Sequence, residues 1–234
     1  MTLKPEIKLF SYTNNPLDVI ALAIDVWHEK DFDEKQYTAD KLVEKFRWLL
    51  KQPHQTPFEY VNTVWIIKNV SRAFQQQLTR HRVGFSYSIQ SLRIVDAGNF
   101  ADEGRFTLPE SVIYKQTYYN YMKSIQDKYK TMIVTGEKIE DARGILPLNI
   151  HSPITMSCSY RSLLGLLKQR LCVAAQEEWK LIAEGIRQEL MKVHPVFAEP
   201  IDCLCNRFKN GKGFCKTLHY EVNREGIINK KGGD

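Results

Sequence analysis

The chain has 234 residues, of which 43% are hydrophobic and 26% charged, as in an ordinary globular protein rather than a disordered one. This length suits one domain or two small ones, with a core that needs no covalent staples. Lysine and arginine number 33 against 27 acidic residues, and the net charge of +6 is compatible with nucleic acid or an anionic small ligand. No stretch approaches the about 18 apolar residues of a membrane span, and the N-terminus lacks the features of a secretory signal. We therefore expect a cytoplasmic protein with no membrane partner.

Three elements are predicted in the first third of the chain. Apolar residues recur at helical spacing over 16–29 and again over 37–52, where Pro53 ends the second helix. The β-branched and aromatic residues of 60–70 favour a strand.

The middle of the chain continues with mixed elements. Residues 70–80 are predicted to be helical and 83–95 extended, with turn chemistry at 96–99. A long, tyrosine-rich helix is predicted over 109–135, and Gly136 follows it as a helix stop.

The last part of the predicted domain is mainly helical. A short helix over 137–143 leads to a connection at 144–153, and the last strong helix is predicted over 160–193. Because helices dominate a small strand content, we predict an α+β fold. It is a single domain over 1–200, with a small β-sheet flanked by long helices.

The C-terminal tail, 201–234, is predicted to be irregular and frayed at its end. It contains three of the five cysteines, which we expect to be reduced thiols because no secretory signal precedes them. Three thiolates and an imidazole could bind zinc tetrahedrally, although the spacing is not that of a standard finger, and we predict no metal. The four residues are Cys203, Cys205, Cys215 and His219.

Arginines and short hydroxyl side chains are concentrated in one segment, 77–93. Guanidinium groups offer planar forks of donors that suit phosphate and carboxylate, and serines add donors without bulk. This pattern indicates an anion cradle, and a basic surface patch is the alternative. The residues that form it are Arg80, His81, Arg82, Ser86, Ser88, Ser91 and Arg93.

Arg170 lies within an apolar helical stripe. It follows Leu163, Leu166 and Leu167 by seven, four and three residues, on the same predicted face. An isolated buried charge is too costly, so we expect this arginine to be paired, either in a structural ion pair or with a ligand. By themselves, His54 is typical of a turn and Arg143 of the surface.

Four blocks of sequence follow one another over most of 50–180. The blocks are His54-x-Thr56-Pro57-Phe58-Glu59; Gln77-x-x-Arg80-His81-Arg82 with Ser91-x-Arg93; Ala142-Arg143-x-x-Leu146-Pro147-Leu148-Asn149; and Arg161-Ser162-Leu163 to Leu167-x-x-Arg170 with Ala175-Gln176-x-Glu178. In this order and at similar spacings, they resemble the flavin-dependent thymidylate synthases, the ThyX family.

The resemblance implies an enzyme of the methyltransferase class. Such enzymes use bound FAD, reduced by NADPH, to complete the transfer of a one-carbon unit from methylenetetrahydrofolate to C5 of dUMP, which gives dTMP. They need no cysteine nucleophile. The family is typically a homotetramer with shared active sites, so the resemblance implies self-association and dUMP as partners, and no nucleic acid.

The resemblance also implies residue roles. Thr56, Arg80, His81, Arg82 and Arg161 would contact FAD. Arg170 would lie against the uracil and stabilise its negative charge, electrostatic catalysis that needs no proton shuttle. His54 would lie on the folate side of the flavin. The residues implied for dUMP are Gln77, Arg80, Ser91, Leu92, Arg93, Arg143 and Arg170.

The chain departs from the family pattern at four places. Residues 83–90 place eight positions between Arg82 and Ser91, where the family has seven, and we assign the extra residue to Gly84-Phe85, where a glycine could absorb a bulge. Ile89, Ser159 and Gly165 replace residues that are polar in the family.

Two alternatives remain. The departures motivate a ThyX-like enzyme with an altered pyrimidine substrate or a hydroxymethylated product. A nucleic-acid-binding module would instead use the basic 68–93 region and the tyrosine-rich helix, or the cysteine tail as a small zinc module. Against it, the charge is modest and no known binding motif is present.

Overall fold

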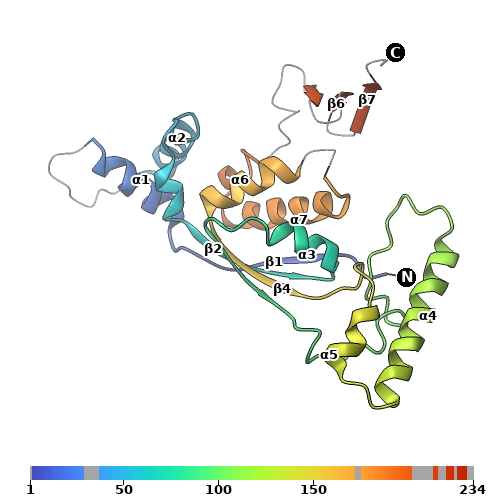
Figure 1. The fold of residues 1–234 in the computed structure, drawn as a ribbon. Coiled ribbons are helices and arrows are strands. Elements are labelled where there is room, and N and C mark those ends of the chain that lie inside the picture. The colour runs from blue at the N-terminus through green and yellow to red at the C-terminus, as the bar shows by residue number, and fades with distance from the viewer. Residues whose placement is uncertain are drawn as a thin grey trace. The chain divides into compact units, whose positions relative to one another are not determined.

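The computed structural model describes residues 2–28, 37–171 and 175–201, and the backbone of three further strands within 213–230. Helices alternate along the chain with the strands of a small sheet (Figure 1), so the predicted α+β class is confirmed. Within the described residues, no helix is long and apolar enough to cross a membrane.

Four strands form one sheet in the order β1-β2-β4-β3. They are β1 (Glu6–Tyr12), β2 (Asn62–Lys68), β3 (Phe85–Ile89) and β4 (Ile154–Ser159). The sequence analysis predicted β2 and β3 but neither β1 nor β4. β1 is an edge strand whose residues are all at least partly exposed, and its exposed and half-buried residues alternate only over 6–10, which is a weak strand signal. In β4 the buried residues Ile154, Met156 and Cys158 alternate with more exposed ones. This alternation indicates a strand, but it is short and the prediction missed it.

The chain divides into two compact units, and the boundary between them falls within each of the four strands. The first unit comprises Met1–Ile7, Ile66–His81 and Tyr87–Met156. The second comprises Lys8–Trp65, Arg82–Ser86 and Ser157–Asp234.

The first unit contains three α-helices and one short 3-10 helix. They are α3 (Arg72–Leu78), α4 (Lys115–Val134), α5 (Ile139–Ala142) and η2 (Arg143–Ile145). The Ser71 hydroxyl caps α3 by accepting the Phe74 N–H at 3.0 Å. Gly136, with φ +95°, ends α4 in the left-handed conformation that favours glycine, as predicted.

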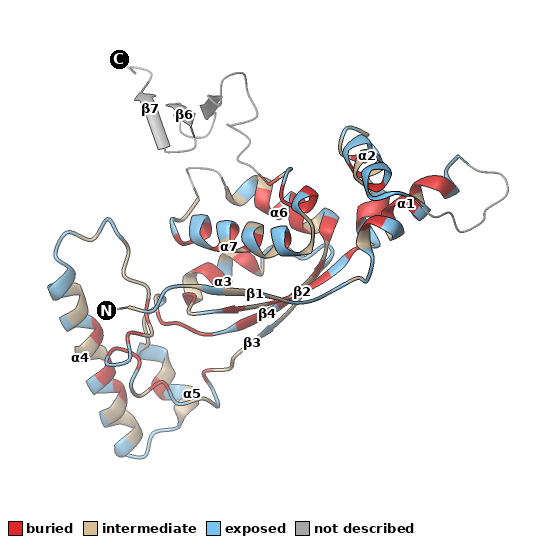
Figure 2. Cartoon of the chain, turned by 180° about the vertical axis from the view of Figure 1, so that it is seen from behind, coloured by how far each residue is buried: buried red, intermediate tan, exposed pale blue. Residues whose placement is uncertain are grey.

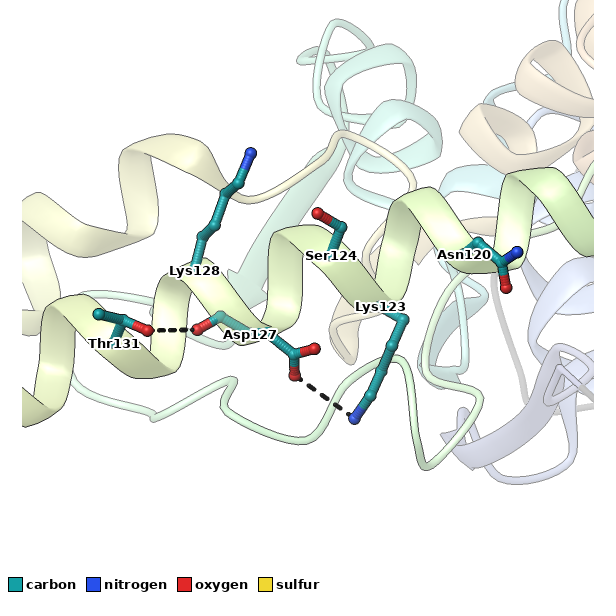
Figure 3. Close-up of a pocket in the computed structure, with 6 residues that line it drawn as sticks. All are labelled: Asn120, Lys123, Ser124, Asp127, Lys128 and Thr131. Atoms are coloured by element: carbon teal, nitrogen blue, oxygen red, sulfur yellow. Dashed lines mark hydrogen bonds and ion pairs between the residues drawn. The ribbon is translucent and has the colours of Figure 1, made fainter.

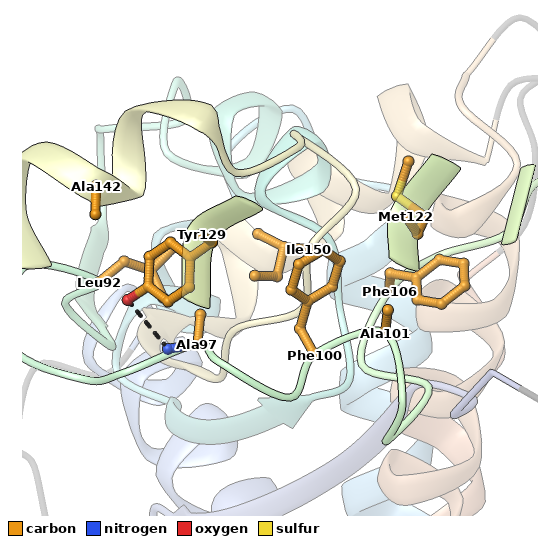
Figure 4. Packing of buried hydrophobic residues seen from close by; sticks show 9 residues of the cluster. All are labelled: Leu92, Ala97, Phe100, Ala101, Phe106, Met122, Tyr129, Ala142 and Ile150. Carbon is orange, nitrogen blue, oxygen red and sulfur yellow. Dashed lines mark hydrogen bonds between the residues drawn. The ribbon is translucent and has the colours of Figure 1, made fainter. Parts of the chain in front are cut away.

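A hydrophobic core fills the first unit between α4, α5 and the loop that precedes them (Figure 4). Tyr129 is fully buried and its hydroxyl accepts the Ala97 N–H at 3.5 Å. Burying such side chains contributes about 1.5–3 kcal/mol each. The cluster comprises Leu92, Ala97, Phe100, Ala101, Phe106, Met122, Tyr129, Ala142 and Ile150.

The second unit contains the remaining helices. They are α1 (Pro16–Val26), α2 (Ala39–Leu50), η1 (Thr56–Glu59), α6 (Tyr160–Arg170), α7 (Glu178–Val193) and η3 (Pro195–Phe197). Its core centres on four aromatic rings, Phe46, Phe58, Tyr160 and Phe197, whose neighbouring centroids lie 5.0–5.9 Å apart. The red stripe of α7 in Figure 2 is its buried face, which includes Trp179.

The predicted helix over 160–193 is wrong as a single element. α6 ends at Arg170 and α7 begins at Glu178 (Figure 1). The Arg170 guanidinium carbon lies 5.1 Å from the centre of the Trp179 ring, whereas residues nine apart in one continuous helix are about 13.5 Å apart along its axis. No glycine or proline marks the break, so the local sequence gave no signal.

Three other predicted boundaries differ from the structure. The helix predicted from 109 begins at Lys115, because the Val112 N–H closes a turn on the Pro109 carbonyl and the β-branched Val112 and Ile113 disfavour a helix. The extended segment 83–95 ends at Ile89. The tail predicted to be irregular contains β5 (Gly213–Cys215), β6 (Tyr220–Asn223) and β7 (Gly226–Lys230), an antiparallel sheet held by backbone pairing. The division into a domain at 1–200 and a tail stays a prediction.

Candidate active site

Glu140 brings together two of the arginines that the sequence predicted for the nucleotide. Its carboxylate accepts hydrogen bonds from Arg93, at 2.7 Å from Nη2 and 3.2 Å from Nε. Its backbone carbonyl accepts the Arg143 Nε–H at 3.2 Å. Arg93 follows β3 and Arg143 ends α5, so the first unit gathers residues that are 50 positions apart in the sequence.

Arg72 lies beside this pair, and sequence reasoning missed it. Its Nη1 donates to Gln75 Oε1, the Gln90 carbonyl and the Ser152 hydroxyl at 3.2, 3.3 and 3.4 Å. Burial, followed by the positive charge of Arg143, lowers the pKa of Arg72. The sign in the sequence that Arg72 could belong to the site was its position in the first turn of α3, the helix that also carries Gln77.

The charges of this arginine cluster, Arg72, Arg93 and Arg143, are not balanced. Glu140 pairs with Arg93, but among the described residues no carboxylate pairs with Arg72 or Arg143. Partly buried guanidinium groups that repel one another are stabilised by a nearby anion, and the charge of Arg143 acts on Arg72 in this way. The arrangement therefore suits a doubly charged group such as a phosphate monoester.

Ser91 and Leu92 form the turn that carries Arg93. The Ser91 hydroxyl accepts the Arg93 N–H at 3.3 Å, and the Ser91 carbonyl accepts the N–H groups of Ile94 and Val95. The Leu92 side chain is buried in the core of the first unit, which anchors the turn. Hydrogen bonds thus link Ser91 to Arg93, and Glu140 links Arg93 to Arg143, while their binding of a common ligand stays a prediction.

Gln77, Arg80 and His81 lie at the end of α3. Gln77 is half-buried on the helix and Arg80 is exposed just after it. The His81 N–H bonds to the Leu78 carbonyl, and the His81 carbonyl accepts the Tyr87 hydroxyl at 2.7 Å. The backbone of this part of the signature is therefore fixed, while the Arg80 side chain reaches solvent.

The second unit gathers two residues predicted for FAD. Thr56 begins η1, and Glu59 in the same short helix accepts a hydrogen bond from Arg161 Nη1 at 2.5 Å. Arg161 lies in the first turn of α6 and is 44% exposed, so its guanidinium is oriented but accessible. His54 is exposed two residues before η1.

Arg82 belongs to the same unit. Its carbonyl accepts the Phe85 N–H at 3.4 Å, which closes a turn with Gly84 at its third position. Gly84 has φ +75°, so the prediction that a glycine absorbs the extra residue of the signature agrees with its backbone.

Arg170 is the last residue of α6 rather than part of a continuous stripe. Its guanidinium lies over the Trp179 ring, a cation–π contact across the break between α6 and α7. The side chain is half-buried and makes further interactions, so it is not isolated, while the ion pair or ligand contact expected for it stays a prediction. Val173 and Ala174, expected to continue the stripe, lie outside the described residues.

The departures from the family pattern have structural explanations in α6. Ser159 is the N-cap of α6, where its hydroxyl accepts the Ser162 N–H at 3.2 Å, a role that serine and asparagine fill equally well. At Gly165 a Cβ would meet nothing within 4 Å, so the face of α6 that carries Arg161 is open there. Nothing in the structure explains Ile89.

Two other regions bear on the search for a site. Cys203, Cys205, Cys215 and His219, considered for zinc, lie outside the residues whose side chains are described. A shallow groove runs along one exposed face of α4 (Figure 3), and none of the residues predicted for the nucleotide or the flavin lines it. It is lined by Asn120, Lys123, Ser124, Asp127, Lys128 and Thr131.

The comparisons with known proteins identify the family. The model of the family described as thymidylate synthase complementing protein matches residues 8–196. The flavin-dependent thymidylate synthase of Saccharolobus solfataricus is 31% identical over 194 residues, which cover 81% of this chain and 74% of that protein. The enzyme of the same name from Clostridium tetani is 29% identical over 213 residues, covering 83% and 85%. The chain therefore belongs to the family of flavin-dependent thymidylate synthases, and it is an enzyme of that family.

Solved structures share the fold. ThyX from Helicobacter pylori, crystallised with FAD and dUMP, superposes with a TM-score of 0.69 at 21% identity over 83% of this chain and 97% of that chain. PolB from Streptomyces cacaoi, a UMP/dUMP methylase bound with 5-Br dUMP, gives a TM-score of 0.68 at 19% identity, covering 86% and 96%. The ThyX-like fold expected from the sequence is confirmed.

Proposed function

We propose that the chain is a thymidylate synthase that converts dUMP to dTMP, with FAD as cofactor, methylenetetrahydrofolate as one-carbon donor and NADPH as reductant. Family membership supports the reaction class. The arginine cluster at Arg72, Arg93 and Arg143 is the single structural observation that supports dUMP as the substrate, because two of its guanidinium groups have no carboxylate partner among the residues that the structure describes.

The phosphate of dUMP would bind at this cluster. Arg93 and Arg143 donate charged hydrogen bonds to its oxygens, and the backbone amides of Ser91 and Leu92 add neutral ones. Arg72 contributes positive charge from a half-buried position, where the field of a charge is stronger than in water. Gln77 and Arg80 would contact the nucleoside.

The residues of the second unit fit a flavin dinucleotide. Arg161, Arg82 and the Thr56 hydroxyl offer donors to a pyrophosphate. Arg80 and His81, which the family resemblance also implies for the flavin, belong to the first unit. When bound, the flavin supplies the electrons that complete the methyl group. Arg161 needs no reorientation, since Glu59 already holds its guanidinium while 44% of the side chain stays accessible.

Arg170 would activate the uracil. A guanidinium plane held against Trp179 can donate to a carbonyl oxygen and to N3, and it stabilises the negative charge that develops there as C5 becomes nucleophilic. No cysteine is required: Cys158 is buried and its pKa is raised to about 12 by burial, so this thiol is not a nucleophile. His54, exposed beside η1, would contact the folate.

Self-association as a homotetramer with shared active sites is part of the proposal. Large apolar side chains stay exposed along and beside α4 in the single chain, and association of copies would cover them. They are Ile113, Tyr114, Tyr121 and Val134. Size-exclusion chromatography with light scattering tests it, and a monomer that binds FAD and turns over would contradict it. The cytoplasmic location stays a prediction.

An altered pyrimidine substrate or a hydroxymethylated product is the second candidate. The open face at Gly165 and the apolar Ile89 favour it, because each lacks a polar group that the family pattern places there.

Mass analysis of the nucleotide separates these candidates. The protein is incubated without oxygen with FAD, NADPH, methylenetetrahydrofolate and dUMP. A methyl gain supports dTMP synthesis, and a hydroxymethyl gain supports the altered product. Bound flavin without conversion indicates another pyrimidine, and absence of both flavin and conversion would overturn the proposal.

Arg170→Lys tests the mechanism. Lysine keeps the charge but cannot offer a planar pair of donors over Trp179. We expect kcat to fall about 100-fold or more while KM for dUMP changes less, as for other electrostatic stabilisers of a transition state. Unchanged turnover in Arg170→Lys and Arg170→Ala would remove this residue from the mechanism.

A further inference from the structure

Gly84 occupies a turn that only glycine adopts easily. The turn runs from Arg82 to Phe85, and Gly84 stands at its third position with φ +75°, as in a type II turn. Val83, at the tip, is 91% exposed. The turn lies in the part of the signature that is one residue longer than in the family, and it leads directly into β3.

The absence of a side chain at Gly84 also permits a close approach to α6. A Cβ built at this position would lie 2.1 Å from Ser162 Oγ and 3.1 Å from Ser162 Cβ. The first distance is far below any real contact, so an alanine here must displace either the turn or the helix.

The Ser162 side chain cannot adopt another rotamer without losing a hydrogen bond. Its hydroxyl accepts a hydrogen bond from the Ser159 hydroxyl at 3.2 Å, and its N–H donates to the same Ser159 oxygen at 3.2 Å. These two bonds cap the first turn of α6. The turn at Gly84 therefore rests on a fixed surface.

Each of the two segments that meet at this contact contains an arginine. Arg82 begins the turn, two residues from Gly84, and Arg161 immediately precedes Ser162. Both arginines are exposed, and Glu59 already orients Arg161. Docking the turn on α6 therefore sets the position of one arginine relative to the other.

We propose that Gly84 is a positioning residue: by lying against Ser162 it lets the lengthened signature dock on the start of α6, so that Arg82 and Arg161 bind the same phosphate-bearing cofactor. The inference rests on the proposed flavin function. It identifies how this chain accommodates its extra residue and which contact would fail if a side chain filled the space.

Gly84→Ala with Gly136→Ala as matched control tests the proposal. Both glycines have positive φ, but a Cβ at Gly136 would meet nothing within 4 Å. Alanine thus strains the backbone at both sites and disturbs a contact only at Gly84. Flavin affinity, measured by fluorescence quenching, should weaken about tenfold or more in Gly84→Ala and by less than about threefold in Gly136→Ala.

Ser162→Ala provides the rescue. It removes the oxygen at 2.1 Å, so the double variant Gly84→Ala/Ser162→Ala should bind flavin more tightly than Gly84→Ala alone, measured against the Ser162→Ala single variant. If Gly84→Ala does not fold, Ser162→Val enlarges the same contact from the helix side and should weaken flavin binding in its place.

The outcomes distinguish a failure of the proposed flavin function from a failure of the inference about Gly84. If the unaltered protein takes up no flavin, the proposed function fails. If it binds flavin but Gly84→Ala loses no more affinity than Gly136→Ala, or the double variant recovers none, then Gly84 serves the turn alone and the inference is overturned.

Discussion

The carboxylate of Glu140 accepts two hydrogen bonds from the guanidinium of Arg93, one from each of two nitrogens. The Arg93 side chain is 61% exposed and that of Glu140 39%, so this ion pair adds about 1 kcal/mol or less to folding. The main effect of the ion pair is to position the Arg93 side chain, which it holds beside Arg143 and Arg72.

Replacing Arg93 should therefore affect binding far more than stability. Arg93→Ala is expected to raise KM for dUMP about ten- to 100-fold, the loss of one charged hydrogen bond. The melting temperature should change little. Arg187→Ala is the control, since it removes a similar surface pair with Glu184 on α7. Equal KM values for the two variants would exclude Arg93 from the substrate site.

Arg72 should contribute to nucleotide binding although no ligand role was predicted for it. Arg72→Gln removes a half-buried positive charge next to Arg143, so KM for dUMP should rise about tenfold. Gln76→Ala, an exposed change on the same helix, is the control. The thermal stabilisation that dUMP gives should shrink in Arg72→Gln alone, and an undiminished shift would show that Arg72 is structural.

His151 should make stability depend on pH. Only 6% of it is exposed, and burial, followed by the charge of Arg105, lowers its pKa from 6.5 to about 4. The depressed value means that protonation favours the unfolded chain, so the free energy of unfolding is unaffected above pH 6.5 and falls between pH 6.5 and 4. The total loss is about 3 kcal/mol.

Denaturant unfolding across this pH range measures the effect. His151→Gln should flatten the dependence, whereas His54→Gln, at an exposed site, should leave it intact. A slope that persists unchanged in His151→Gln would assign it to other groups.

Gly165→Ala should stabilise the protein. Gly165 lies inside α6, where a Cβ meets nothing within 4 Å, and alanine in a helix interior is favoured over glycine by about 1 kcal/mol. Gly136→Ala should destabilise, since its φ of +95° suits only glycine. Urea midpoints of the two variants should move in opposite directions, and a loss in Gly165→Ala would reveal an interaction at this face.

Much of the helical framework followed from local patterns. α1, α2 and α3 were predicted within a few residues, because their buried faces repeat at helical spacing and Pro53 follows the end of α2; Gly136 likewise marked the end of α4. β1 and β4 were missed because their alternation of less and more exposed residues is short and, in β1, includes no buried residue. The prediction of one helix over 160–193 failed because no local signal marks the break.

The sequence by itself determined the family and the residue types of the site, since four motifs in order specify both. Only the tertiary structure decided that Arg72 joins Arg93 and Arg143, that Arg170 lies over Trp179, and that Gly84 touches Ser162. The reason is physical: propensity and periodicity act over a few residues, whereas these contacts join segments that meet only after the cores of the two units have packed.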